Sequence, residues 1–151
     1  GIGAIKFPMF SRESGKIVTF DWESALDFNG QAAPYIQYAY VRANSILKKF
    51  NAPLPGSTTP GDNLSESEIA LIDLISRMPA EIQKAARELK PLTVCNLSYE
   101  LAKAFNDFYV QCPVLIAEEP VRSARIRLVA AAKQAIANSL ALLGITAPQA
   151  M

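Results

Sequence analysis

The chain has 151 residues, 50% of them hydrophobic, and its 15 lysines and arginines nearly balance its 14 acidic residues, which leaves a net charge of +1. Because it has no histidine and only two cysteines, it lacks the usual general base of nucleophilic catalysis and the ligands of a common zinc site, so we expect neither a catalytic centre nor a metal site. No apolar run approaches the roughly 20 residues of a membrane span and no signal sequence is present, which favours a soluble, cytoplasmic protein without membrane contact.

The first 22 residues differ in composition from the rest of the chain. They contain two early glycines, Pro8 and a short β-prone run at residues 16–20. This composition favours a short irregular N-terminal extension that serves as a connector. The remaining residues, 23–151, show helical periodicity, and we predict an all-α bundle of about five to six helices.

Residues 34–50 form the first long helix that the sequence predicts, with Pro34 in its first turn. At about 100° per residue, one stripe faces the core: Ile36, Tyr40, Ala43, Leu47 and Phe50. A second stripe, about 145° away, consists of Tyr35, Tyr38, Arg42, Ser45 and Lys49. Aromatic rings beside cationic groups suit stacked bases and phosphates. Tyrosines that flank a core and keep their hydroxyls in water give the same pattern, so periodicity leaves both interpretations open.

A loop and two short helices are predicted next. Residues 51–63 are rich in proline and glycine and lack periodic apolar content, which is typical of a mobile loop. Ser65 and Glu68 have the spacing of a capping box and start a helix that ends before Pro79. A second helix begins at Pro79 and stops at Pro91, because proline is favoured in a first turn and disfavoured in a helix interior. The two helices would form a hairpin.

Two longer helices complete the predicted bundle. Residues 92–112 place a stripe of apolar side chains within about 100° of one another, and we interpret Cys95 and Cys112 as small buried hydrophobes. Residues 121–143 are apolar over more than half of the helix circumference, which predicts that this helix is the central one. Gly144 stands where a left-handed C-terminal cap is expected.

Charge is unevenly distributed along the chain. Residues 51–90 carry four basic against six acidic side chains, and this acidic middle is expected to face away from any polyanion, while the mildly basic ends share one face. Arg122, Arg125 and Arg127 begin the last predicted helix. We interpret Arg127 as a solvated cation over an apolar stem. For the other two arginines, the solvated and the phosphate-binding interpretations both stay open.

Residues 29–42 carry the most specific motif of the chain. Their sequence is Asn-Gly-Gln-Ala-Ala-Pro-Tyr-Ile-Gln-Tyr-Ala-Tyr-Val-Arg, which resembles the Asn/Glu-Gly-x-x-Ala/Gly-Pro-Tyr-x-Gln-Tyr-x-x-x-Arg motif of arginyl-tRNA synthetases. Other segments resemble the same family in the same order: residues 3–6, 20–22, 95–99, 104–109 and 142–151. The resemblance covers essentially the whole chain, and residues 51–63 match least well.

The resemblance implies a carboxyl-terminal fragment of a synthetase. Residues 1–22 would be the tail of the preceding catalytic domain, and residues 23–151 would be an α-helical anticodon-binding domain. The fragment itself would be no enzyme and would need no cofactor, whereas the parent arginine–tRNA ligase would use ATP and Mg²⁺. Its partners would be the anticodon stem-loop of arginine tRNA and the parent's own catalytic domain, and the chain would be a monomer.

The resemblance and the tyrosine stripe together give the candidate RNA-binding residues. The family's motif implies Tyr35, Tyr38 and Arg42, a tyrosine near the end of a later helix implies Tyr109, and the family's C-terminus implies Met151. The stripe adds Lys49. Tyr40 matches a variable position and belongs to the core-facing seam. The chain departs from the family before its final methionine, where Gln149-Ala150 replaces the usual acidic and basic residues, so a contact from a penultimate arginine is missing.

Two other classes of protein fit parts of the pattern. A helical protein-interaction module would use the tyrosine stripe as a hot-spot patch and would have no role in RNA binding. A related anticodon domain from a cysteinyl- or methionyl-tRNA synthetase would share the architecture, but it lacks the Pro-Tyr-x-Gln-Tyr match. The salt dependence of binding to an anticodon stem-loop separates the RNA-binding classes from the protein-only class.

Overall fold

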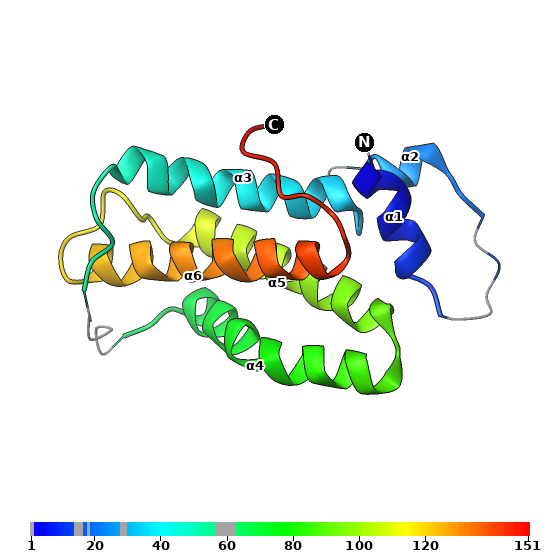
Figure 1. Cartoon of the computed structure of the whole chain (residues 1–151). Coiled ribbons are helices and arrows are strands. Elements are labelled where there is room, and N and C mark those ends of the chain that lie inside the picture. The colour runs from blue at the N-terminus through cyan, green and yellow to red at the C-terminus, as the bar shows by residue number, and fades with distance from the viewer. Residues whose placement is uncertain (1, 14–16, 18, 28–29, 57–62) are drawn as a thin grey trace.

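The computed structural model describes residues 2–13, 17, 19–27, 30–56 and 63–151. It contains helices α1 (Ile2–Phe10), α2 (Trp22–Ala25), α3 (Ala33–Phe50), α4 (Glu66–Glu88), α5 (Pro91–Gln111) and α6 (Val121–Leu142). No strand occurs among the described residues, which confirms the all-α prediction (Figure 1). The β-prone run at residues 16–20 forms no strand where it is described; Lys16 and Val18 lie outside the described residues, as do Asn29 of the motif and 57–62 of the predicted loop.

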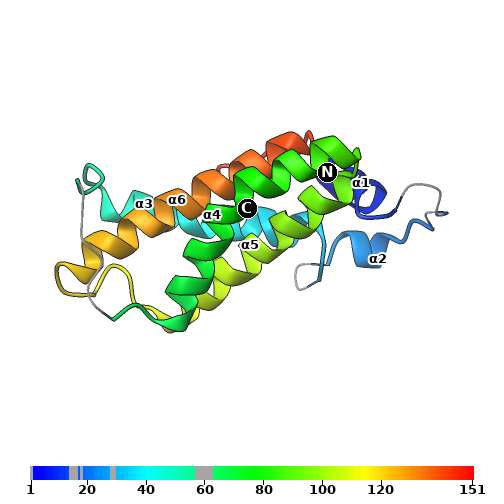
Figure 2. The same ribbon diagram turned by 90° about the horizontal axis from the view of Figure 1, so that it is seen from below.

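Four long helices form the body of the molecule, with α5 and α6 between α3 and α4 (Figures 1 and 2). Helix α5 contacts α1, α3, α4 and α6, so it takes the central place that the sequence predicted for the last helix. The acidic middle of the chain, most of which is α4, therefore lies across the α5 and α6 layer from α3. None of the helices in the described ranges is long and apolar enough to span a membrane.

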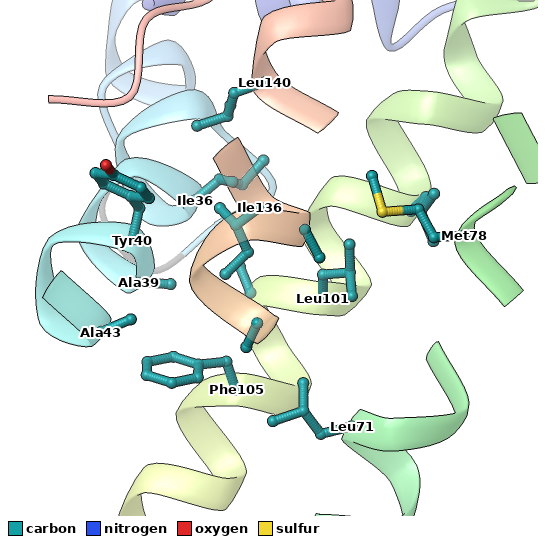
Figure 3. Packing of buried hydrophobic residues seen from close by; sticks show 14 of the residues in the cluster. Ile36, Ala39, Tyr40, Ala43, Leu71, Met78, Leu101, Phe105, Ile136 and Leu140 are labelled. Carbon is teal, nitrogen blue, oxygen red and sulfur yellow. The ribbon is translucent and has the colours of Figure 1, made fainter. Parts of the chain in front are cut away.

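The core joins apolar side chains from α3, α4, α5 and α6 (Figure 3). Figure 3 shows this cluster with Ile36, Tyr40, Leu71, Leu101, Phe105, Ile136 and Leu140 among its members. Tyr40 is only 6% exposed, which confirms that it belongs to the core rather than to the surface stripe. Both cysteines are free and buried, as predicted, and burial raises the pKa of the Cys95 thiol to about 12.

The prediction of an irregular N-terminal extension is wrong, because the described N-terminal segment begins with helix α1. Ala4 and Phe7 lie one turn apart and are buried, and α1 contacts both α3 and α5. Tertiary burial of this short apolar face thus outweighs the weak local helix signal around Pro8. Gly3 lies at this close approach, where a Cβ would be 3.3 Å from Cβ of Ala33 in α3 and 3.0 Å from Cγ2 of Ile145, so a larger residue would require these side chains to shift.

The prediction of two helices that meet at Pro79 is also wrong, because one helix, α4, continues through this proline. Proline removes one intrahelical hydrogen bond. Met78 and Ala85, on the two sides of this position, are both buried, and α4 packs on α5 and α6. Burial of both halves therefore keeps the helix in one piece despite the lost hydrogen bond.

Both predicted helix caps are present. Ser65 and Glu68 form the capping box at the start of α4. Gly144 has φ +62°, and the amides of Gly144 and Ile145 bond to the carbonyls of Ala141 and Leu140 at 2.9 Å each, which is the Schellman arrangement. The first cap has a tertiary partner as well, because Arg125 Nε donates to Glu68 Oε1 at 2.8 Å.

The Glu68–Arg125 ion pair connects α4 to α6 in a buried setting. Burial alone would raise the pKa of the Glu68 carboxyl, but hydrogen bonds from Arg125 and Ser65 outweigh it and hold this pKa below its ordinary value. The pair therefore stabilises the fold above the ordinary glutamate pKa of about 4.3, and this contribution is lost as the pH falls through the lower pKa of the folded state.

We predict that Glu68→Gln keeps the capping box but lowers the free energy of unfolding at pH 7 by about 3 kcal/mol, because Arg125 loses its counter-charge. Denaturant unfolding across the acid range measures this. The difference from the wild type should shrink as the pH falls below about 4.3. Asp73→Asn, which breaks the exposed pair with Arg77, is the control and should cost less than about 1 kcal/mol. A difference for Glu68→Gln that stayed constant down to about pH 3 would contradict this account.

Candidate nucleic-acid interface

Two helices bring three of the predicted site residues together around one guanidinium. Tyr38 and Arg42 lie one turn apart on α3, and Tyr109 lies on α5. The Arg42 Cζ atom lies 4.7 Å from the centroid of the Tyr38 ring and 4.5 Å from that of the Tyr109 ring. Both tyrosine residues are 43% exposed. We call Tyr38, Arg42 and Tyr109 the tyrosine–arginine cluster.

The direction of each side chain in this cluster follows from the core. Ile36 and Tyr40 turn one side of α3 into the bundle, which leaves Tyr38 facing outward, since neighbours two residues away lie on different sides of a helix. On α5, Phe105 and Phe108 are fully buried, which directs Tyr109 to the surface. Core packing of the two helices thus sets the spacing between the two tyrosine rings.

Hydrogen bonds fix the guanidinium in its place. Arg42 Nη1 donates to Oδ1 of Asn106 at 2.7 Å, and Nη2 donates to the hydroxyl of Tyr38 at 3.2 Å. Asn106 is three residues before Tyr109 and therefore lies on the same side of α5. Sequence reasoning missed Asn106; the i, i+3 spacing to a candidate tyrosine was the available signal.

A surface cavity of about 280 Å³ adjoins the cluster. Arg42, Lys49 and Tyr109 supply its polar side, which places Lys49 beside two of the other predicted residues. Its apolar wall consists of Ile46 and the segment after α5: Val114, Leu115 and Ile116. A flat apolar group that carries a negative charge at its edge matches this combination of walls.

Tyr35 and Met151 do not share the contacts that join Tyr38, Arg42 and Tyr109. Tyr35 is half-buried, and its ring centroid lies 5.4 Å from that of Tyr99 on α5. Met151 is 57% exposed at the end of the C-terminal segment. The structure therefore groups Tyr38, Arg42, Lys49 and Tyr109 and gives Tyr35 a different aromatic neighbour.

The C-terminal segment that carries Met151 runs back along α3 (Figure 1). Gln37 Nε2 donates to the carbonyl of Thr146 at 2.8 Å, and Asn44 Nδ2 donates to that of Gln149 at 3.2 Å. The two amides are seven residues apart, so they lie on one stripe of α3. They hold the last residues against the same helix that carries Tyr38 and Arg42. Sequence reasoning missed both amides.

The three arginines of α6 bond within the chain. Arg125 bonds to Glu68 and to the carbonyl of Pro113, and Arg122 bonds to Glu119. Arg127 is exposed, as predicted for a solvated cation, and it also donates to the carbonyls of Pro55 and Gly56 in the loop after α3. These bonds favour a structural role for all three, including the two that the sequence left open.

Comparison with known proteins places the chain in a family. Residues 36–151 match the DALR anticodon binding domain, so the chain belongs to the family of DALR anticodon-binding domains. Within it, the chain is 45% identical to an arginine–tRNA ligase of Methanocella arvoryzae and 43% identical to that of Pyrococcus abyssi, in each case over its whole length. The match covers 26% and 25% of those proteins, so the chain spans about a quarter of the length of these curated relatives.

A solved structure agrees with this assignment. Arginyl-tRNA synthetase of Thermus thermophilus superposes with a TM-score of 0.89 at 34% identity, over 99% of this chain and 26% of that one. The resemblance to arginyl-tRNA synthetases that the motif at residues 29–42 predicted is thereby confirmed.

We predict that Asn44→Ala releases the end of the C-terminal segment, because the carbonyl of Gln149 loses its hydrogen-bond donor. Amide hydrogen exchange at residues 149–151 should speed up, and the free energy of unfolding should fall by about 1 kcal/mol. Ser45→Ala is the matched control, since the Ser45 hydroxyl bonds to the carbonyl of Val41 within α3 and to no other residue that the structure describes. Equal exchange at residues 149–151 in both variants would show that Asn44 does not hold this segment.

Proposed function

We propose that this chain is the anticodon-binding part of an arginine–tRNA ligase and that it docks the anticodon stem-loop of arginine tRNA. The observation that carries the proposal is the tyrosine–arginine cluster, which presents two half-exposed rings and a cation on one side of the bundle. Arginylation itself, with ATP and Mg²⁺, belongs to a catalytic domain outside this chain. The chain alone is a binding domain that works in the cytoplasm, as a monomer.

Stacking and charge supply the proposed binding energy. Loop bases that are turned out of their own stack lie on the exposed faces of Tyr38 and Tyr109, where each stacked base contributes roughly 1 to 3 kcal/mol. Arg42 and Lys49 contact phosphates or base edges beside the cavity. A base entering that cavity would meet the apolar wall and the Tyr109 ring together.

Tyr35 and Met151 extend this interface in our proposal. Tyr35 contributes the part of its ring that Tyr99 leaves uncovered. Met151 has a flexible apolar side chain that can pack on an unstacked base. Its position depends on Gln37 and Asn44, which fasten the preceding carbonyls to α3.

The N-terminal helices are the proposed contact to the catalytic domain. Ile2, Ile5 and Met9 lie on one stripe of α1 and are 70%, 45% and 60% exposed. Trp22 and Leu26, at the neighbouring helix α2, are 60% and 45% exposed. Clustered exposed apolar side chains of this size commonly mark a contact surface, and residues 1–22 are the part of the chain that we assign to the catalytic domain's tail.

We predict that Tyr38→Ala and deletion of Met151 each weaken binding to the anticodon stem-loop of an arginine tRNA without unfolding the bundle. The loss for Tyr38→Ala should be about tenfold, as expected for one stacked base. Filter binding at fixed salt measures it, with circular dichroism to check the fold. Val110→Ala, a substitution of an exposed residue next to Tyr109 in the sequence, is the control. Wild-type affinity in both test variants would show that Tyr38 and Met151 do not contribute to RNA binding.

Salt dependence separates the proposal from a protein-interaction module. Contacts to phosphates release counterions, so affinity for the stem-loop should fall steeply between about 50 and 200 mM salt. Stem-loops from tRNAs for other amino acids should bind more weakly under the same conditions. A chain that binds no stem-loop in a salt-dependent way would instead fit the module with a tyrosine hot-spot patch.

We also predict that Met9 and Trp22 react readily with hydroxyl radicals in the isolated chain but are protected in the full-length ligase. Mass spectrometry of the oxidised peptides measures this. Val110, an exposed residue in the last turn of α5, is the control and should react equally in both proteins, because it is not part of the apolar surface of α1 and α2. Equal reactivity of Met9 and Trp22 in both proteins would show that the catalytic domain does not cover this surface.

A further inference from the structure

The side chain of Asn106 fixes one edge of the Arg42 guanidinium. Its Oδ1 accepts the 2.7 Å hydrogen bond from Nη1, while the Tyr38 hydroxyl accepts the longer bond from Nη2. The rings of Tyr38 and Tyr109 border the same group. A long arginine side chain is thus ordered before any ligand arrives, which reduces the entropy that binding must remove.

The side chain of Asn106, which accepts the hydrogen bond from Arg42, is neutral, whereas several other arginines pair with charged side chains. Carboxylates pair with three of them: Asp73 with Arg77, Glu119 with Arg122 and Glu68 with Arg125. An amide oxygen orients a guanidinium by a hydrogen bond but adds no negative charge. Arg42 therefore keeps its full positive charge next to two exposed rings.

The remaining donors of the half-buried Arg42 have no hydrogen-bond partner among the described residues. A guanidinium has five N–H groups, and the bonds to Asn106 and Tyr38 use two of them. Because tyrosine rings border the group, a ligand reaches it best in its own plane, where parallel N–H groups match the oxygens of a phosphate.

We infer that Asn106 is a positioning residue for RNA binding, which orients Arg42 toward a backbone phosphate of the anticodon loop and leaves its charge uncompensated. The inference rests on the proposed function and deepens it, because it assigns the Arg42 contact to a phosphate and explains why the acceptor is an amide.

The charge test compares Asn106→Asp with Asn96→Asp in the 151-residue chain. Asn96 is exposed on the same helix, where it bonds to Gln31, and it lies about 15 Å along the axis from Asn106. Asn106→Asp keeps the acceptor and should fold as stably as the wild type, but it pairs with Arg42. We expect its affinity for the arginine anticodon stem-loop to fall at least tenfold at low salt. The steepness with which the logarithm of the affinity falls with the logarithm of the salt concentration should decrease by about 0.7 to 0.9, the value for one phosphate contact. Asn96→Asp should change neither the affinity nor this salt dependence by as much.

The orientation test is a double-mutant cycle of Asn106→Ala and Arg42→Ala. Asn106→Ala alone should weaken binding about fivefold, because Arg42 keeps its charge but loses its fixed direction. In the Arg42→Ala background it should cause no further loss, since the residue acts only through Arg42. Thermal unfolding of each variant is measured as a control, to check that a loss of binding does not result from unfolding of the bundle.

Three outcomes would overturn the inference. A wild-type salt slope and affinity in Asn106→Asp would mean that Arg42 makes no phosphate contact. A loss from Asn106→Ala that persists without Arg42 would assign Asn106 to the fold instead. If the wild-type chain binds no stem-loop at all, the proposed function fails, and the inference fails with it; the first two outcomes leave the proposed function standing.

Discussion

The guanidinium of Arg42 lies between tyrosine rings from two different helices, so its position depends on how α3 packs against α5. Each cation–π contact at an exposed site contributes about 0.5 to 1 kcal/mol, and each hydrogen bond about 1 kcal/mol. Ordering an arginine side chain costs about 2 kcal/mol of rotamer entropy. The cluster is therefore only slightly favourable by itself, and it depends on fully buried residues such as Ile36 and Phe105 to hold the two helices at the right spacing.

Placement of charge explains how a chain with a net charge of +1 can present a cationic surface. The arginines of α6 bond to carboxylates or carbonyls within the chain, and most of the acidic middle is in α4, across the bundle from α3. Arg42 bonds to an amide and a hydroxyl, and Lys49 lies beside it at the cavity. Local arrangement of partners, rather than total charge, thus leaves the proposed RNA interface with two cations that pair with no carboxylate among the described residues.

Local signals in the sequence were sufficient for the helix caps and for the burial of Tyr40, because these depend on residues within a turn or two of each other. Tertiary packing decided the features that were wrong or missed. Helix α1 and the continuity of α4 through Pro79 both depend on burial against other helices. The bond between Arg42 and Asn106 joins residues 64 positions apart, so periodicity could place each on its own helix but could not pair them. The family resemblance, in contrast, had already named both tyrosines, Tyr38 through the motif at residues 29–42 and Tyr109 through the segment at residues 104–109.

NMR titration of the labelled chain with an arginine anticodon stem-loop shows directly whether RNA binds at the tyrosine–arginine cluster. We expect the largest shifts at the ring protons of Tyr38 and Tyr109 and at the Arg42 Nε–H, together with contacts from these rings to base protons. Signals from the exposed side of α4, such as those of Ile69 and Ile72, should stay unchanged. Shifts concentrated on α4 or on α1 and α2, with the cluster unaffected, would contradict RNA binding at the cluster.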